Sequence, residues 1–250
     1  MKKIIYFFGI QFLVLLFASC DHMTVSTSEN GSGEKIKGNG KLVTKVREIN
    51  SFNAIDVEGV FNVIIDQGTK ESVKIETDEN IEPLILTDVG NSMLKVRLKD
   101  STTIKDMKKI NVYITLVDIH QLSTTGVGTV KSANALHLKD LSLKLQGVGV
   151  TSLILIGERL DVHSEIVGGL TLSGTENEVT IDHDGVGLIQ AFDLKAEKLS
   201  LKSDGVGAAE VYASNEISID AKGIGGVRYK GGAQKRHIKN EGIGKVVEVE

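Results

Sequence analysis

Aromatic residues are scarce in this chain of 250 residues: tryptophan is absent, and Phe, Trp and Tyr together make up only 4%. Proteins often hold sugars on aromatic platforms, and few such platforms are available here, although Tyr212 and Tyr229 lie near the C-terminus. Pro83 is the only proline. A composition so poor in aromatic residues and proline is explained by stacked strands of aliphatic residues.

Other absences narrow the classes of function. One cysteine excludes an intrachain disulfide, and 29 basic against 33 acidic residues leave a net charge of −4 with no basic patch. Nucleic acid is therefore not an expected partner. The sequence holds no His-Glu-x-x-His zinc motif, no Gly-x-Ser-x-Gly nucleophile motif and no phosphate-binding loop.

The N-terminus carries a targeting pattern. Two lysines follow Met1, and an apolar run from Ile4 to Phe17 is too short for a comfortable membrane span but suits a signal peptide. The following Ala-Ser-Cys resembles the cleavage box of bacterial lipoproteins, although Phe17 stands where that box usually has Leu. We predict a signal peptide over 1–19 and lipidation of Cys20. The alternative is an ordinary secreted protein with an incidental cysteine.

Residues 20–40 are rich in Ser, Thr, Gly, Asn and Glu and lack periodic apolar residues. This composition predicts a flexible tether that holds the folded part off the membrane. The folded domain is expected over 41–250.

A Gly-Val-Gly or Gly-Ile-Gly triplet recurs through the chain in one register. Complete triplets begin at Gly126, Gly147, Gly185, Gly205, Gly223 and Gly242, and degenerate copies begin at Gly59 and Ile166. From Gly126 onward the steps are 21, 19, 19, 20, 18 and 19 residues. A fixed period of this size indicates a stack of similar units.

Residues at the same offset from the first triplet position form columns. The columns four before and four after that position are almost entirely aliphatic, and the residue in the middle of the triplet is Val or Ile in all eight copies. Alternation with period two around the triplets predicts strands. We therefore predict an all-β fold: a right-handed parallel β-helix or β-solenoid of about 19-residue coils, with an irregular β-meander at its N-terminal end.

The triplet itself is predicted to turn the corner of each coil. Glycine permits unusual φ values and close backbone approach, and we expect the Val between the glycines to point into the core. Phe61 and Ile166 replace glycine in two copies, so neither glycine position is obligatory. An alternative is that the coil containing Gly168 and Gly169 has slipped by two residues.

Polar columns are expected on the outside. The column three before the triplet reads Lys144, His163, Asp182, Lys202, Asp220 and Lys239, with alternating signs from Asp182 on. Stacked strands lie about 4.8 Å apart, so these charges should neutralise one another. The column just before the triplet is mostly acidic.

The first two triplets begin 67 positions apart, at Gly59 and Gly126, and the residues between them lack the repeat. Strands are predicted at residues 73–76, 94–98 and 112–116, with turns at 66–69 and 89–92. One short helix is predicted between Asp78 and Leu86, capped by Asp78 and with Pro83 in or near its first turn.

The segment from Phe52 to Val63, the turn at Gln67-Gly68, residues 94–96 and the repeated triplet together resemble the auto-transporter adhesin, head GIN domain family. The resemblance covers residues 45–230. It implies a lipid-anchored β-solenoid of Gram-negative bacteria, held at the outer membrane and facing the periplasm or the cell surface. It carries over no catalytic residues.

Two classes of function remain open. The first is a non-enzymatic, lipid-anchored binding scaffold or adhesin for an extracellular polymer or protein, without a cofactor, whose open C-terminal edge could also pair with another copy. The second is a polysaccharide-acting enzyme, or a carbohydrate- or calcium-binding module, that uses the outward carboxylates near His163 and His183. The candidate binding face is formed by Glu165, Asp182, Asp184 and Asp204.

Overall fold

The structure, a computed structural model, describes residues 23–26, 34–100, 102–107 and 109–250. The predicted signal peptide and Cys20 lie outside the described residues. Among those residues, no helix has both the length and the apolar character needed to cross a membrane.

Strands account for nearly all the regular structure. In chain order the elements are β1 (Met23–Ser26), β2 (Glu34–Lys37), β3 (Leu42–Arg47), β4 (Ala54–Gln67), β5 (Ser72–Asp78), the 3₁₀ helix η1 (Glu82–Leu84), β6 (Ile85–Gly90), β7 (Met93–Leu98), β8 (Thr102–Met107), β9 (Asn111–Leu116), β10 (Gln121–Ser132), β11 (Leu136–His183), β12 (Val186–Ser203), β13 (Val206–Ala221), β14 (Val227–Lys230), β15 (Lys235–Asn240) and β16 (Val246–Glu248). The all-β prediction is confirmed.

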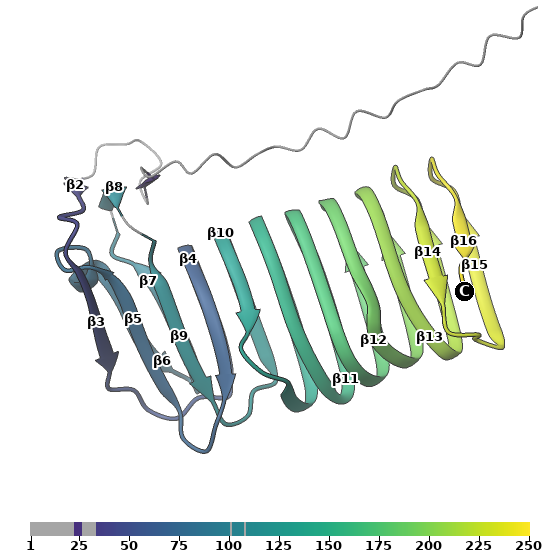
Figure 1. Ribbon diagram of the computed structural model, residues 1–250, viewed down its shortest axis with the longest axis horizontal. Coiled ribbons are helices and arrows are strands. Elements are labelled where there is room, and N and C mark those ends of the chain that lie inside the picture. The colour runs from purple at the N-terminus through teal and green to yellow at the C-terminus, as the bar shows by residue number, and fades with distance from the viewer. Residues whose placement is uncertain (1–22, 27–33, 101, 108) are drawn as a thin grey trace, which may run out of the picture.

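The triplets set the register of the main sheet. β10 pairs in parallel with β4 on one side and with β11 on the other, which aligns Gly126 with Gly59 and with Gly147. The same parallel pairing joins β11 to β12 and β12 to β13. Successive repeats therefore lie side by side along the long axis of the molecule (Figure 1).

The core runs through the stack as columns of aliphatic side chains. In the column four before the triplet, exposure is 3% or less from Ile55 to Ile219. Ile238 continues this column but is 42% exposed, because it belongs to the last repeat and no further repeat covers it. The inward direction predicted for the columns four before and four after the triplet is confirmed.

The predicted direction of the triplet valine is wrong. Val127 is 46% exposed and Val186 is 49% exposed, so the middle residue lies on the outer surface. The physical reason is the period-two alternation of a strand: the inward columns lie at even offsets from the first triplet position, whereas the middle residue lies at an odd offset.

The glycines face inward at a bend where the repeats approach closely. Gly207 has φ of +147°, and a Cβ there would overlap the carbonyl oxygen of Gly187 in the neighbouring repeat. Where glycine is replaced, Phe61 and Ile166 point inward and are buried. Gly168 aligns with Gly187, so the proposed slip by two residues does not occur.

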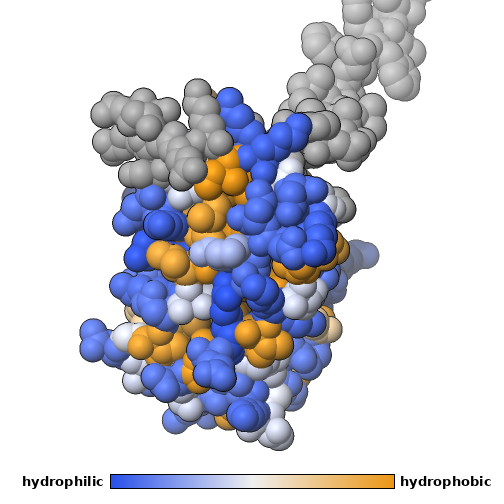
Figure 2. Space-filling view, turned by 90° about the vertical axis from the view of Figure 1, so that its left-hand side faces the viewer, coloured by the Kyte–Doolittle hydropathy of each residue, from blue (hydrophilic) through white to orange (hydrophobic). Residues whose placement is uncertain are grey.

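Segments without the repeat cover the N-terminal end of the stack. β7 and β9 pair in parallel with the two halves of β4, whereas β5 pairs antiparallel with β9 and β3 antiparallel with β5. The three predicted strands are confirmed as β5, β7 and β9. Hydrophilic side chains cover most of this end, with smaller hydrophobic areas between them (Figure 2).

The predicted helix is shorter than expected. Only Glu82–Leu84 forms a helix, of the 3₁₀ type, and Ile81 rather than Asp78 is its N-cap residue. The buried carboxylate of Glu82 pairs with Arg47 and lies 3.1 Å from the Lys45 ammonium. These two cations on β3 fix the turn against the sheet.

Two short strands lie within the segment predicted to be a tether. β1 pairs antiparallel with β8, and β2 pairs parallel with it. Strand pairing uses backbone groups and needs no periodic apolar side chains, so the composition of residues 20–40 could not indicate these two strands.

Candidate functional site

The outward side chains just before each triplet form a charged face. The name charged face is used for three columns of side chains on one side of the stacked strands. They stand seven, three and one positions before the first residue of each triplet. Period-two alternation places all three on the outer surface, because their offsets are odd. The four residues of the predicted binding face belong to the last two of these columns.

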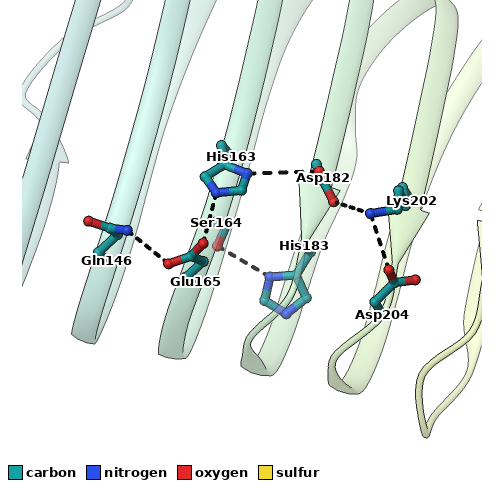
Figure 3. A network of polar contacts seen from close by, with 8 residues as sticks. All are labelled: Gln146, His163, Ser164, Glu165, Asp182, His183, Lys202 and Asp204. Carbon is teal, nitrogen blue, oxygen red and sulfur yellow. Dashed lines mark hydrogen bonds and ion pairs between the residues drawn. The ribbon is translucent and has the colours of Figure 1, made fainter.

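Contacts on the charged face run along the stack. The Gln146 amide Nε2 donates to Glu165 Oε2 at 2.8 Å, and His163 Nε2 lies 3.0 Å from Glu165 Oε1 (Figure 3). His163 Nδ1 is 3.9 Å from Asp182 Oδ2 in the next repeat. Two hydrogen bonds hold the pKa of Glu165 below its usual value: the one from Gln146 has the larger effect and the one from His163 the smaller.

Lys202 joins two of the predicted acidic residues. Its ammonium lies 3.4 Å from Asp182 Oδ1 and 3.1 Å from Asp204 Oδ2 (Figure 3). These contacts, with Asp204 contributing most, raise the pKa of Lys202. The cation therefore already lies where a bound metal ion would have to sit between the two carboxylates.

The four predicted residues do not converge on one point. Glu165, Asp182 and Asp204 are linked only through His163 and Lys202, and Asp184 is an exposed residue whose backbone N–H donates to the Ser164 carbonyl oxygen at 3.0 Å. Across the described part of the chain, no three His, Cys, Asp or Glu side chains are placed to hold a metal ion.

His183 does not belong to the charged face. It points inward, is 5% exposed, and its Nδ1 lies 3.2 Å from Oγ of the buried Ser164 (Figure 3). Burial lowers the pKa of His183. The neutral imidazole is packed in the interior, out of reach of an external substrate, so it cannot act with the outward carboxylates.

Sequence reasoning missed a second column of alternating charge. Seven positions before the triplet stand Asp140, Arg159, Glu178, Lys198, Glu216 and Lys235. Arg159 and Glu178 form an ion pair at 3.2 Å, and the strand register places Lys198 between Glu178 and Glu216. The sequence already contained this pattern, because the charge changes sign from each of these six residues to the next.

A polar groove was also missed. It has a volume of about 590 Å³ and is lined partly by Asn62, Tyr113 and Lys131. Asn62 Nδ2 donates to Asn111 Oδ1 at 3.2 Å, and the Thr129 hydroxyl donates to Asn62 Oδ1 at 3.0 Å. The groove brings together strands β4, β9, β10 and β11, so no single stretch of sequence could reveal it.

The two tyrosines noted in the sequence are not free platforms. Tyr229 is 7% exposed, and the Lys195 ammonium lies 4.3 Å from the centre of the Tyr212 ring. Phe192 is likewise covered, with the Lys230 ammonium 4.6 Å from its ring centre.

Comparison with solved structures agrees with this architecture. A "putative adhesin" from Bacteroides fragilis NCTC 9343 is 30% identical, with a TM-score of 0.83, over 86% of this chain and 100% of that chain. A "putative adhesin" from Parabacteroides merdae ATCC 43184 is 23% identical, with a TM-score of 0.60, over 86% and 99% of the two chains. A "putative lipid binding protein" from Parabacteroides distasonis ATCC 8503 is 21% identical, with a TM-score of 0.62, over 86% and 100%.

The last two similarities show the fold alone. No curated protein matches the chain. Residues 51–233 match the family described as "Putative auto-transporter adhesin, head GIN domain". With most of the chain inside this match, and with a solved relative at 30% identity, the protein belongs to this head GIN domain family.

Proposed function

We propose that this protein is a non-enzymatic binding protein of the cell envelope, anchored by lipid on Cys20. The observation that carries the proposal is the linear pairing of charges along the stack. Catalysis needs groups that converge on a reacting atom. On the charged face the groups instead neutralise neighbours, partly in the same repeat, as Lys202 does with Asp204, and partly in the adjacent repeat, as Arg159 does with Glu178. Such a self-neutralised row suits a stable surface for recognition.

The proposed scaffold is a right-handed parallel β-solenoid. The parallel register of β4, β10, β11, β12 and β13 supports it, as do the steps of 18 to 21 residues between aligned triplets. Such a stack offers an extended surface to a polymer or to another protein.

The polar groove is the better of the two candidate ligand surfaces. It is concave, and its lining combines amide and hydroxyl groups, Lys109 and Lys131 with aliphatic side chains such as Ile64 and Val150. These groups suit a polar polymer that carries hydroxyl or acidic groups. The charged face, by contrast, is occupied by its own ion pairs.

Binding can be tested with the full chain on an array of glycans and matrix proteins. The variant Lys109→Ala with Lys131→Ala should weaken the captured signal at least tenfold, since it removes both lysines of the groove. The matched control, Lys202→Ala on the charged face, should bind like the unchanged protein. Equal loss in both variants, or no binding to any member of the array, would contradict the groove proposal.

The lipid anchor has its own test. Cys20→Ala should move the protein from the membrane fraction to the soluble fraction, whereas Asp21→Asn should leave it in the membrane. A Cys20→Ala protein that stays with the membrane would sink the anchor proposal. Protease treatment of intact cells would then distinguish a surface position from a periplasmic one.

The alternative of a calcium-binding or polysaccharide-acting site has less support. Lys202 separates Asp182 from Asp204, and His183 is buried away from both. New reducing or unsaturated ends after incubation with polysaccharides would nevertheless revive the enzymatic alternative.

A further inference from the structure

An exposed aliphatic ridge runs along the bend of the stack. It consists of the middle residues of seven consecutive triplets: Val127, Val148, Val167, Val186, Val206, Ile224 and Ile243. Their exposure ranges from 45% to 73%. Single exposed aliphatic residues are ordinary, but a continuous row is typical of an interaction site.

The two columns beside the ridge differ in character. On one side, two positions further along, the column reads Thr129, Val150, Gly169, Leu188, Ala208, Gly226 and Lys245, so it is uncharged except at its C-terminal end. Val150 and Leu188 in this column are each 49% exposed and extend the apolar surface. On the other side lies the column just before the triplet, which includes Glu165, Asp184 and Asp204.

The size of this apolar strip matches half of a protein interface. Nine aliphatic side chains, each about half exposed, offer on the order of 700 Å², close to the ~800 Å² that each partner contributes to a standard interface. The spacing is equally informative. The ridge repeats at the separation of paired strands, about 4.8 Å, and a second copy of this chain has the same repeat.

We propose that two copies of this protein associate ridge to ridge about a two-fold axis parallel to the stack. A two-fold axis in this direction places the acidic column of each copy opposite the uncharged column of its partner. An axis across the stack would instead place the acidic columns against each other, at a cost from like-charge repulsion. The charge pattern therefore selects the parallel arrangement, in which both N-termini lie at the same end.

Charge disfavours another mode of self-association, through the C-terminal edge. All six residues of β15 are exposed, and the strand carries Lys235, Arg236 and Lys239, so two copies of it would bring like charges together. Each cation is partly compensated by a carboxylate: Arg236 by Glu248 at 2.6 Å, Lys239 by Glu241 at 3.0 Å and Lys235 by Glu216 at 3.9 Å. The ridge carries no charge of its own.

The association is tested by sedimentation and light scattering on the chain carrying Cys20→Ser, which prevents lipidation. We expect a dimer, and Val186→Glu should weaken dimerisation at least tenfold, because the two introduced carboxylates would face each other. Val186→Thr keeps the β-branched shape and should weaken it much less. Leu188→Glu, beside the ridge, is a second variant that should weaken dimerisation. Circular dichroism of each variant checks that it folds.

A monomer at high protein concentration, or a dimer that persists in both glutamate variants, would overturn the proposal. Orientation is tested by oxidative cross-linking in the same Cys20→Ser background. Val127→Cys should form a disulfide with Val127→Cys of the second copy. Cross-links that form only between Val127→Cys and Ile243→Cys chains would show an antiparallel pair and contradict the parallel arrangement.

Discussion

Glu176 is a carboxyl group buried in the interior of the stack. It is 3% exposed, its Oε2 has no hydrogen-bond partner among the described residues, and it lies against Gly157 of the preceding repeat. Burial, with a smaller contribution from the charge of Asp140, raises the pKa of Glu176 to about 7. The folded protein therefore holds a proton here that the unfolded chain releases near pH 4.5.

This difference predicts that Glu176 makes stability fall as pH rises from about 4.5 to about 7, by at most about 3 kcal/mol. Glu176→Gln removes the ionisation, so the variant should gain stability over the unchanged protein at pH 8 and little at pH 5. Thermal unfolding of both proteins at the two pH values measures this. Glu178→Gln, at an exposed ion pair with Arg159, is the control and should show no such gain.

His183 acts in the opposite direction. Its lowered pKa means that the unfolded chain takes up a proton first as pH falls, so its contribution to stability declines below about pH 6.5. Comparing Glu176→Gln with the unchanged protein cancels this contribution, since both contain His183.

Two adjacent glycines allow a sharp comparison. Gly168 has φ of +149°, and a Cβ there would overlap the carbonyl oxygen of Gly149, whereas a Cβ at Gly169 would lie 3.9 Å from the nearest atom, Val150 Cγ1. We expect Gly168→Ala to lower the free energy of unfolding by more than about 2 kcal/mol. Gly169→Ala should change it by less than about 1 kcal/mol. Similar losses in urea titrations of both variants would contradict this account of the triplet.

At the scale of the strand, alternation decides which substitutions are severe. Val206 on the ridge is 45% exposed, whereas Val211, five residues further along β13, is fully buried. Val211→Asp should cost more than about 4 kcal/mol, because it places an unpaired charge in the core. Val206→Asp should cost about 1 kcal/mol or less, mostly through lost strand propensity.

Urea denaturation at low protein concentration, where association does not contribute, gives both values. If Val206→Asp proved as damaging as Val211→Asp, the ridge would have to face the core after all.

The strand elements could be predicted well where the repeat is regular. Aliphatic columns at even offsets identified the core, and the three strands before the second triplet were found at their observed positions. The valine direction was mispredicted although the same alternation contained the answer. At the corner the two outer triplet positions face inward, where Phe61 and Ile166 are buried, and the middle position faces outward.

At the scale of the whole molecule, the two ends of the stack differ. β3 and β5 close the N-terminal end with antiparallel pairs, whereas β15 pairs only with β13 within the described chain. The equivalent segment of β12, residues 198–203, has paired strands on both sides. Local stability should therefore fall toward the C-terminus.

Hydrogen exchange can test this gradient. Amides of residues 235–240 should exchange at least tenfold faster than those of residues 198–203, because opening the last repeat exposes little additional core. Exchange followed by mass spectrometry on peptides from both segments supplies the rates. Equal protection of the two segments would mean that something covers the C-terminal edge in solution.

The sequence by itself determined the all-β class, the repeat register, most core columns and the charge alternation, because each depends on spacing along a periodic strand. Only the tertiary structure decided which charges meet, that Lys202 separates Asp182 from Asp204, and that a polar groove forms where β4, β9, β10 and β11 come together. These features depend on distances between segments remote in sequence. The exposed ridge depends on both the sequence and the tertiary structure. Its residues repeat in the sequence, and their position on the outside of the bend follows from packing.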